Sequence, residues 1–172
     1  MRRLPLILAL GNPILTDDRV GLEVGRLLHA RLPAGTAELE EASVGGHELL
    51  HILEGRDRVV IVDAVEAGHL APGEVREVEL ASLERTYAPI TPHNAGLLDC
   101  LKLGRALGMH MPADLVVFAI GVEEARTLSE QMTPRVAAAV PAIVDHVFER
   151  LFGGGGRWAL PATSPPEPSR SS

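Results

Sequence analysis

The sequence predicts an α/β fold, in which a twisted, mostly parallel sheet of about five strands carries helices on both faces. Three observations predict this three-layer architecture. Short, nearly unbroken aliphatic runs alternate with segments whose apolar residues recur at helical spacing. Aromatic residues make up 3% of the chain while 46% is hydrophobic, so the core must be aliphatic. The 172 residues are enough for one domain that buries a sizeable core.

The first half of the chain is expected to supply three strands and two helices. Residues 4–10 form an apolar run that stops at Gly11-Asn12-Pro13, which predicts a buried strand followed by a tight turn. Residues 20–32 have helical periodicity, and one of Thr16, Asp17 and Asp18 is expected to cap this helix. The other elements are a weak strand within residues 37–44, a short helix opened by Gly45-Gly46 and running through Leu53, and the clear strand RVVIVDAV, whose apolar run ends at Asp63.

The second half adds an edge strand, a buried strand and two helices. Pro72-Gly73 turns the chain into a loosely alternating segment, EVREVEL, which is typical of a sheet edge. Thr133-Pro134 is a helix start signal, and Pro141 inside that helix predicts a kink or an early break. A helix over residues 94–106 and a buried strand over residues 115–122 complete the set. We expect a single α/β domain over residues 1–152 and a disordered tail, rich in Gly, Pro and Ser, over residues 153–172.

Charge and composition exclude several classes of partner. The formal net charge of −7 would repel a nucleic-acid backbone, and no run of residues is long and apolar enough for a membrane span. Cys100 is the single cysteine, so an intrachain disulfide is impossible. The N-terminal MRRLPLILALGNP lacks a cleavage pattern and is interpreted as the first core strand, which predicts a cytoplasmic protein.

Two acidic features and one histidine are the candidates for chemistry. Asp17 and Asp18 follow the first strand and Asp63 ends the strongest one, and ligands of such sheets bind outside the carboxyl ends of the strands. His93 follows a proline where a loop turns into a helix. Each also has a structural interpretation: Asp17 as a helix cap, Asp63 as a loop cap, His93 as a surface or core residue. Two carboxylates and one imidazole suit a divalent transition ion with open positions, and best one that another molecule already holds.

Several motifs, in the same order and at similar separations, resemble those of the hydrogenase maturation proteases. These endopeptidases trim the C-terminal extension from the large subunit of nickel–iron hydrogenases. The resemblance covers roughly residues 4–151 and is carried by GNPILTDDRVG, IVDAV and TPHNAGL, supported by GGHELL, APGEV, VVFAIGVE and MTPRV. Where many members have a DGGT-type segment associated with substrate choice, this chain has EASVGG, so its hydrogenase partner is left open.

The resemblance implies a site and a partner. Asp18, Asp63 and His93 match the family's metal-contacting and catalytic positions, with nickel supplied by the substrate and no organic cofactor. The implied partner is a nickel-loaded large-subunit precursor, processed by a monomer. Residues expected to support the site structurally are Gly11, Asn12, Asp17, Gly46 and Gly96.

Two other functions fit part of the same pattern. LALGNP with HNAG also resembles peptidyl-tRNA hydrolases, but Pro13 and His93 are too far apart in the chain and the acidic charge does not suit tRNA. A non-enzymatic nickel-sensing or chaperone module on the same fold would keep all three candidate ligands. Binding without cleavage of the precursor distinguishes that module from an endopeptidase.

Overall fold

The computed structural model describes residues 3–43, 45, 48–66, 70–79, 82, 96–158 and 160. A five-stranded sheet in the order β2-β1-β3-β5-β4 forms the middle layer. The pairs β1–β2, β1–β3 and β3–β5 are parallel, and β4 is an antiparallel edge strand on β5. The fold class predicted from the sequence is confirmed. The strands are β1 (Leu6–Leu10), β2 (Glu38–Ala42), β3 (Arg58–Val65), β4 (Val75–Glu79) and β5 (Asp114–Gly121).

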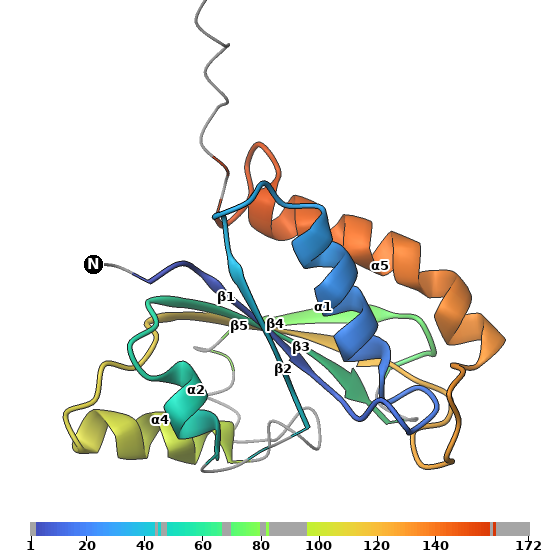
Figure 1. Ribbon diagram of the computed structural model, residues 1–172, viewed down its shortest axis with the longest axis horizontal. Coiled ribbons are helices and arrows are strands. Elements are labelled where there is room, and N and C mark those ends of the chain that lie inside the picture. Colours follow the sequence, from blue (N-terminus) through green and yellow to red (C-terminus); the bar gives the residue numbers. More distant parts are fainter. Residues whose placement is uncertain are drawn as a thin grey trace, which may run out of the picture.

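Helices cover both faces of this sheet (Figure 1). The helices α1 and α5 lie side by side on one face, and α2 and α4 lie together on the other. Each strand alternates its side chains between the two apolar clusters, as Val60 and Ile61 of β3 show. The helices are α1 (Val20–Ala30), α2 (Leu49–Leu53), α4 (Leu97–Ala106) and α5 (Pro134–Phe152).

The three interior strands, β1, β3 and β5, are buried along nearly their whole length, because each is covered on two faces. All five residues of β1 are buried, and in β3 only Arg58 is exposed. This explains why their sequences are continuous apolar runs rather than alternating ones. By contrast, β4 combines half-buried and exposed residues and has no fully buried one, which agrees with the edge strand predicted from its alternating sequence.

Three local predictions are corrected by the structure. The first turn of α1 has no side-chain cap: Arg19 occupies the N-cap position, and the Asp17 carboxylate accepts its hydrogen bonds elsewhere. Of the two effects predicted for Pro141, the early break is wrong: α5 continues for 19 residues, and its apolar stripe remains packed on the sheet.

The third correction concerns the predicted tail, since the chain stays packed beyond Phe152. Trp158 is only 4% exposed and belongs to the cluster beneath α1 and α5. Its indole Nε1 donates to Asp114 Oδ2 at 2.7 Å, and its ring meets that of Phe152 edge-on at 5.9 Å between centroids. Ordered packing therefore extends past the boundary predicted at residue 153. Of the predicted tail, residues 159 and 161–172 lie outside the described part of the chain.

Among the described residues, none of the helices combines the length and the apolar character needed to cross a bilayer.

Candidate functional site

The two predicted acids lie at the carboxyl ends of neighbouring parallel strands. Asp63 is in β3, one position beyond Val62, which pairs with Ala9 of β1. Asp18 lies in the loop that joins the end of β1 to α1. Both are buried, with Asp63 0% and Asp18 7% exposed. The structure thus brings Asp18 and Asp63 to the same edge of the sheet.

Backbone amides orient both carboxylates. Asn12 N–H donates to Asp18 Oδ2 at 2.8 Å, which folds the loop back on itself. Ala64 N–H donates to Asp63 Oδ1 at 2.9 Å. A carboxylate held by a backbone N–H loses rotamer freedom, so each acid is preorganised at this edge.

Two glycines make the close approach of this loop possible. Gly11 has φ +153°, and a Cβ there would lie 2.2 Å from the backbone oxygen of Asp18. Gly21, in the first turn of α1, packs against the strand ends, where a Cβ would lie 2.2 Å from Leu10 O and 3.3 Å from Asp63 Cα. Any side chain at either position would push the loop and α1 away from the sheet.

Asp17 has a different environment from Asp18, its neighbour in sequence. Its carboxylate is completely buried and accepts four donor groups, all from the loop between β5 and α5. These donors are the backbone N–H groups of Glu123, Glu124 and Thr133, at 2.7–3.1 Å, and the Thr133 hydroxyl. Asp17 therefore braces the turn and supports the site structurally, rather than capping α1. It joins two loops at the edge that carries Asp18.

The β5–α5 loop is the part of this edge that the sequence did not reveal. Thr133-Pro134 was expected to start α5, and Thr133 occupies the N-cap position of that helix, but its hydroxyl bonds Asp17 rather than its own helix. Asp17 and Thr133 are 116 residues apart, and only the topology of the sheet brings them together. The start signal at Thr133-Pro134 was visible in the sequence, whereas its partner was not.

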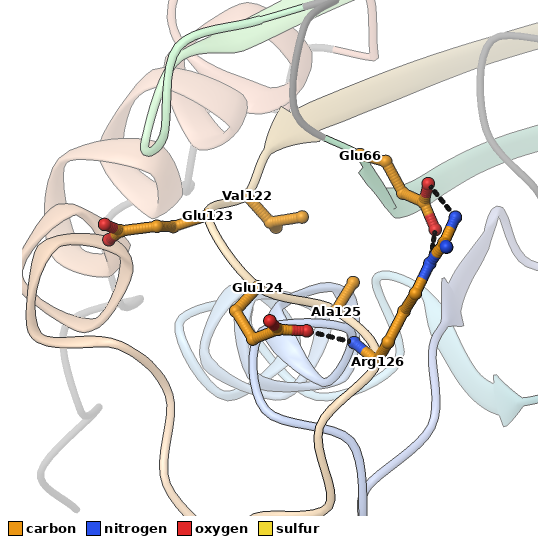
Figure 2. A pocket seen from close by; sticks show the side chains of 6 residues that line it. All are labelled: Glu66, Val122, Glu123, Glu124, Ala125 and Arg126. Carbon is orange, nitrogen blue, oxygen red and sulfur yellow. Dashed lines mark hydrogen bonds and ion pairs between the residues drawn. The ribbon is translucent and has the colours of Figure 1, made fainter.

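A small pocket of about 240 Å³ opens in the same loop, beside the end of β3 (Figure 2). Its lining residues are Glu66, Val122, Glu123, Glu124, Ala125 and Arg126. Arg126 reaches across to Glu66 with two hydrogen bonds, Nε to Oε1 at 3.1 Å and Nη2 to Oε2 at 2.8 Å. Glu124 Oε1 turns back to accept the backbone N–H of Arg126 at 2.7 Å, so Arg126 is held through both its side chain and its backbone.

Hydrogen bonding lowers the pKa of Glu124 below its ordinary value, because its carboxylate accepts the backbone N–H groups of Arg126 and Thr127. On the other side, the pKa of Arg126 is raised by its hydrogen bonds to Glu66. Both groups therefore stay charged throughout the neutral range. The Glu123 side chain points away from the other lining side chains (Figure 2), so Glu66 and Glu124 face Arg126 with one carboxylate in excess, and the field of the pocket is negative.

Of the remaining predicted site residues, the structure describes Gly96 but not His93 or Gly46. Gly96 precedes α4 in a left-handed conformation, φ +82°, which suits glycine at the start of that helix. His93 and Gly46 lie outside the described residues. Within the described part of the chain no three His, Cys, Asp or Glu side chains are grouped to hold a metal ion. The predicted trio includes His93, so it stays a prediction.

Comparison with known proteins identifies the family. Residues 23–150 match the family model described as HycI, hydrogenase maturation protease. The chain is 30% identical over 155 residues to the hydrogenase 2 maturation protease of Escherichia coli K12, covering 87% of this chain and 92% of that protein.

Solved structures agree with this match. The hydrogenase maturating endopeptidase HybD of Escherichia coli is similar with a TM-score of 0.71 and 27% identity, covering 84% of this chain and 90% of that one. The [NiFe] hydrogenase maturation protease HybD of Thermococcus kodakarensis is similar with a TM-score of 0.66 and 28% identity, covering 85% and 97%. The chain therefore belongs to the hydrogenase maturation proteases, a family of hydrolases.

Proposed function

We propose that this protein removes the C-terminal extension of a nickel–iron hydrogenase large-subunit precursor after nickel has been inserted. Membership of the maturation protease family supports the reaction class and the kind of substrate. The observation that carries the proposal for the site is the pair of buried, amide-oriented carboxylates, Asp18 and Asp63, at adjacent strand ends. We further expect the protein to act in the cytoplasm and as a monomer.

In this proposal nickel arrives with the substrate. Asp18, Asp63 and His93 would supply two oxygens and one nitrogen, a set that leaves coordination positions for the groups with which the precursor holds the ion. A protein site with so few ligands binds free nickel weakly but discriminates well between loaded and empty precursor. Recognition of the ion would then act as a check that metal insertion is complete.

The same contact places the scissile bond. Hydrolysis requires water to attack the peptide carbonyl carbon, the C–N bond to break, and the departing amine to gain a proton. Holding the ion between fixed carboxylates orients the nearby bond, which converts a slow encounter into a positioned reaction. The water is activated either by the substrate's nickel or by one of the carboxylates.

Precursor processing tests the site. We expect Asp18→Asn, Asp63→Asn and His93→Ala each to reduce cleavage of nickel-loaded precursor at least about 100-fold, the range for loss of a positioned catalytic group. Asp99→Asn, which removes an exposed carboxylate on α4, is the matched control and should process normally. Cleavage is followed as a mobility shift of the precursor, with nickel-free precursor in parallel.

Each outcome has a distinct meaning. Equal cleavage of loaded and empty precursor would remove the role of nickel, and unimpaired processing by all three variants would remove the site. If the unaltered protein binds loaded precursor and never cuts it, the nickel-sensing or chaperone module replaces the endopeptidase.

A further inference from the structure

Two loops at the end of the sheet that carries Asp18 and Asp63 pair with each other as a short antiparallel ribbon. Leu15 in the β1–α1 loop forms a bridge with Leu128 in the β5–α5 loop. On either side of the bridge, Thr16 N–H donates to Thr127 O and Ser129 N–H donates to Ile14 O, both at 3.0 Å. We call residues 14–16 and 127–129 together the rim ribbon.

One edge of the rim ribbon is open. The flanking hydrogen bonds make Leu15 and Leu128 a non-hydrogen-bonded pair, whose own N–H and C=O groups point outward from the ribbon. On one side Leu15 N–H is satisfied by Asn12 O at 3.2 Å. On the other side, no hydrogen bond joins the N–H or C=O of Leu128 to any described residue. An exposed strand edge of this kind is a template for one more strand.

Two side chains of the rim ribbon are both apolar and well exposed. Leu128 is 72% exposed and Ile14 is 57% exposed. Because side chains alternate between the two faces of a strand, Leu128 faces one side of the ribbon with Leu15 and Ile14 faces the other, and a strand added here would remove apolar surface from water. Asp18 follows Leu15 by only three residues, so the rim ribbon is continuous with the candidate site.

The pocket adjoins the same strand of the ribbon. Glu124, which lines it, accepts the N–H of Thr127 at 3.1 Å, and Arg126 lies two residues before Leu128. At about 240 Å³ the pocket holds a single side chain rather than a larger ligand. Its negative charge favours a basic side chain over an acidic one.

We propose that the rim ribbon is the docking edge for the precursor segment next to the scissile bond, which adds to it as a third strand. Backbone groups of that segment bond Leu128, an apolar side chain covers Leu128 or Ile14, and a neighbouring basic side chain enters the pocket. This mode of recognition explains how an extended chain is held in register without a deep groove. The inference rests on the proposed function, because it takes the precursor as the occupant.

The test compares two exposed leucines. Leu128→Asp places a charge on the rim ribbon. Leu107→Asp places the same charge just after the end of α4, where the chain continues toward the opposite end of the sheet, and Leu107 is similarly exposed, at 64%. With nickel-loaded precursor we expect Leu128→Asp to raise KM about tenfold with kcat within about twofold, and Leu107→Asp to change neither. Circular dichroism melts establish that both variants are folded.

A second measurement avoids side-chain changes. In 15N-labelled protein, a synthetic peptide of the precursor sequence around the cleaved bond should slow hydrogen exchange of the Leu128 amide. The same peptide with its basic residues changed to Glu should bind at least about tenfold more weakly. The docking edge would be overturned, with the function left intact, if three results came together. The unaltered protein would cleave the precursor normally, Leu128→Asp would have an unchanged KM, and the peptide would not protect the Leu128 amide. If the unaltered protein never cleaves, the proposed function fails, while peptide-dependent protection of Leu128 still supports the docking edge.

Discussion

Asp17 and Asp18 are adjacent and chemically identical, yet the fold uses them differently. The Asp17 carboxylate accepts hydrogen bonds from four donor groups of the loop between β5 and α5. The Asp18 carboxylate instead accepts the N–H of Asn12 in its own loop. The pair therefore separates into one acid for the architecture and one for the candidate chemistry.

This separation predicts different costs of substitution. Asp17→Ala leaves buried backbone N–H groups of the β5–α5 loop without their acceptor, and we expect a loss of about 2–4 kcal/mol in the free energy of unfolding. Asp17→Asn, which keeps one acceptor oxygen, should lose less. Urea denaturation followed by circular dichroism measures both. Stability equal to that of the unaltered protein in Asp17→Ala would show that the carboxylate does not hold the two loops together.

Cys100 offers a second test at the scale of one residue. It is the single cysteine, it is 3% exposed in α4, and burial raises the pKa of its thiol. Because the thiolate is the reactive form, the folded protein should react with a thiol reagent only through unfolding. We expect labelling at pH 8 to become fast in denaturant and to be absent in Cys100→Ala. Rapid labelling of the folded protein would contradict the packing of α4 against the sheet.

At the scale of elements, the segment after α5 packs on the end of the sheet where β1, β3 and β5 begin, which we call the amino edge. Arg157 Nε donates to Asp114 Oδ1 at 2.5 Å, and its Nη1 donates to Glu79 Oε1 at 3.0 Å. Asp114 begins β5 and Glu79 ends β4, so one side chain ties two strands. Trp158 then fills the space next to Phe152. We call residues 157–158 the C-terminal clasp.

The clasp should contribute strongly to stability. Trp158→Ala removes a buried indole and leaves a cavity, so we expect a loss of about 3–5 kcal/mol. Trp158→Phe keeps most of the apolar contact but leaves Asp114 Oδ2 without the indole donor, and should lose about 1 kcal/mol. Because Trp158 is the single tryptophan, unfolding is followed by circular dichroism rather than by fluorescence. Equal stability of Trp158→Ala and the unaltered protein would show that the clasp does not contribute.

Most elements were predictable from the sequence because their periodicity is local. β1, β3 and β5 are continuous apolar runs, and the stripe of α5 was legible residue by residue. The C-terminal clasp was not predictable. Its tryptophan stands in a Gly- and Pro-rich segment without periodicity, and its partner, Asp114, is 44 residues away in the chain. The site divides in the same way. Asp18 and Asp63 could be placed by the ends of their strands, whereas the Asp17–Thr133 network and the pocket depend on loops joined by the sheet.

The edge strand β2 carries an ion pair that makes stability depend on pH. Arg56 is only 5% exposed and its Nη2 lies 2.6 Å from Glu38 Oε2, and this hydrogen bond lowers the pKa of the Glu38 carboxyl. In the folded state Glu38 therefore holds its proton less tightly than in the unfolded chain. The stabilisation is present above the unfolded pKa of about 4.3 and is lost as the pH falls through the lower, folded pKa.

We therefore expect Glu38→Gln to be less stable than the unaltered protein at pH 6, and the difference to shrink as the pH approaches 3. Loss of the charged partner leaves Arg56 buried with less compensation, and protonation of Glu38 at low pH removes the same partner from the unaltered protein, which is why the difference shrinks. Glu40→Gln, on the same strand, is the control, since Glu40 forms no ion pair with the described residues. Guanidinium denaturation at several pH values measures the difference. A gap between Glu38→Gln and the unaltered protein that widens toward acid would reverse the sign argued here.

At the scale of the whole molecule, the sheet separates stability from chemistry along its strands. The C-terminal clasp and Arg56 lie at the amino edge, where β1, β3 and β5 begin. Asp18, Asp63, the rim ribbon and the pocket lie at the carboxyl edge, where the same strands end. The strands between them are buried, hydrogen-bonded and stiff, so damage at one edge should not displace side chains at the other.

This arrangement gives a prediction that involves both edges. At a temperature well below its lowered melting point, Trp158→Ala should process nickel-loaded precursor with a kcat/KM within about twofold of the unaltered protein, because distant and unshared sites contribute additively. Asp18→Asn should show the opposite pattern, with near-normal stability and at least about 100-fold less processing. The double variant should combine both losses, within about 0.5 kcal/mol in stability. A large fall in kcat/KM for Trp158→Ala while it remains folded would mean that the amino edge controls the position of the carboxylates, and the two edges would then have to be treated as one coupled unit.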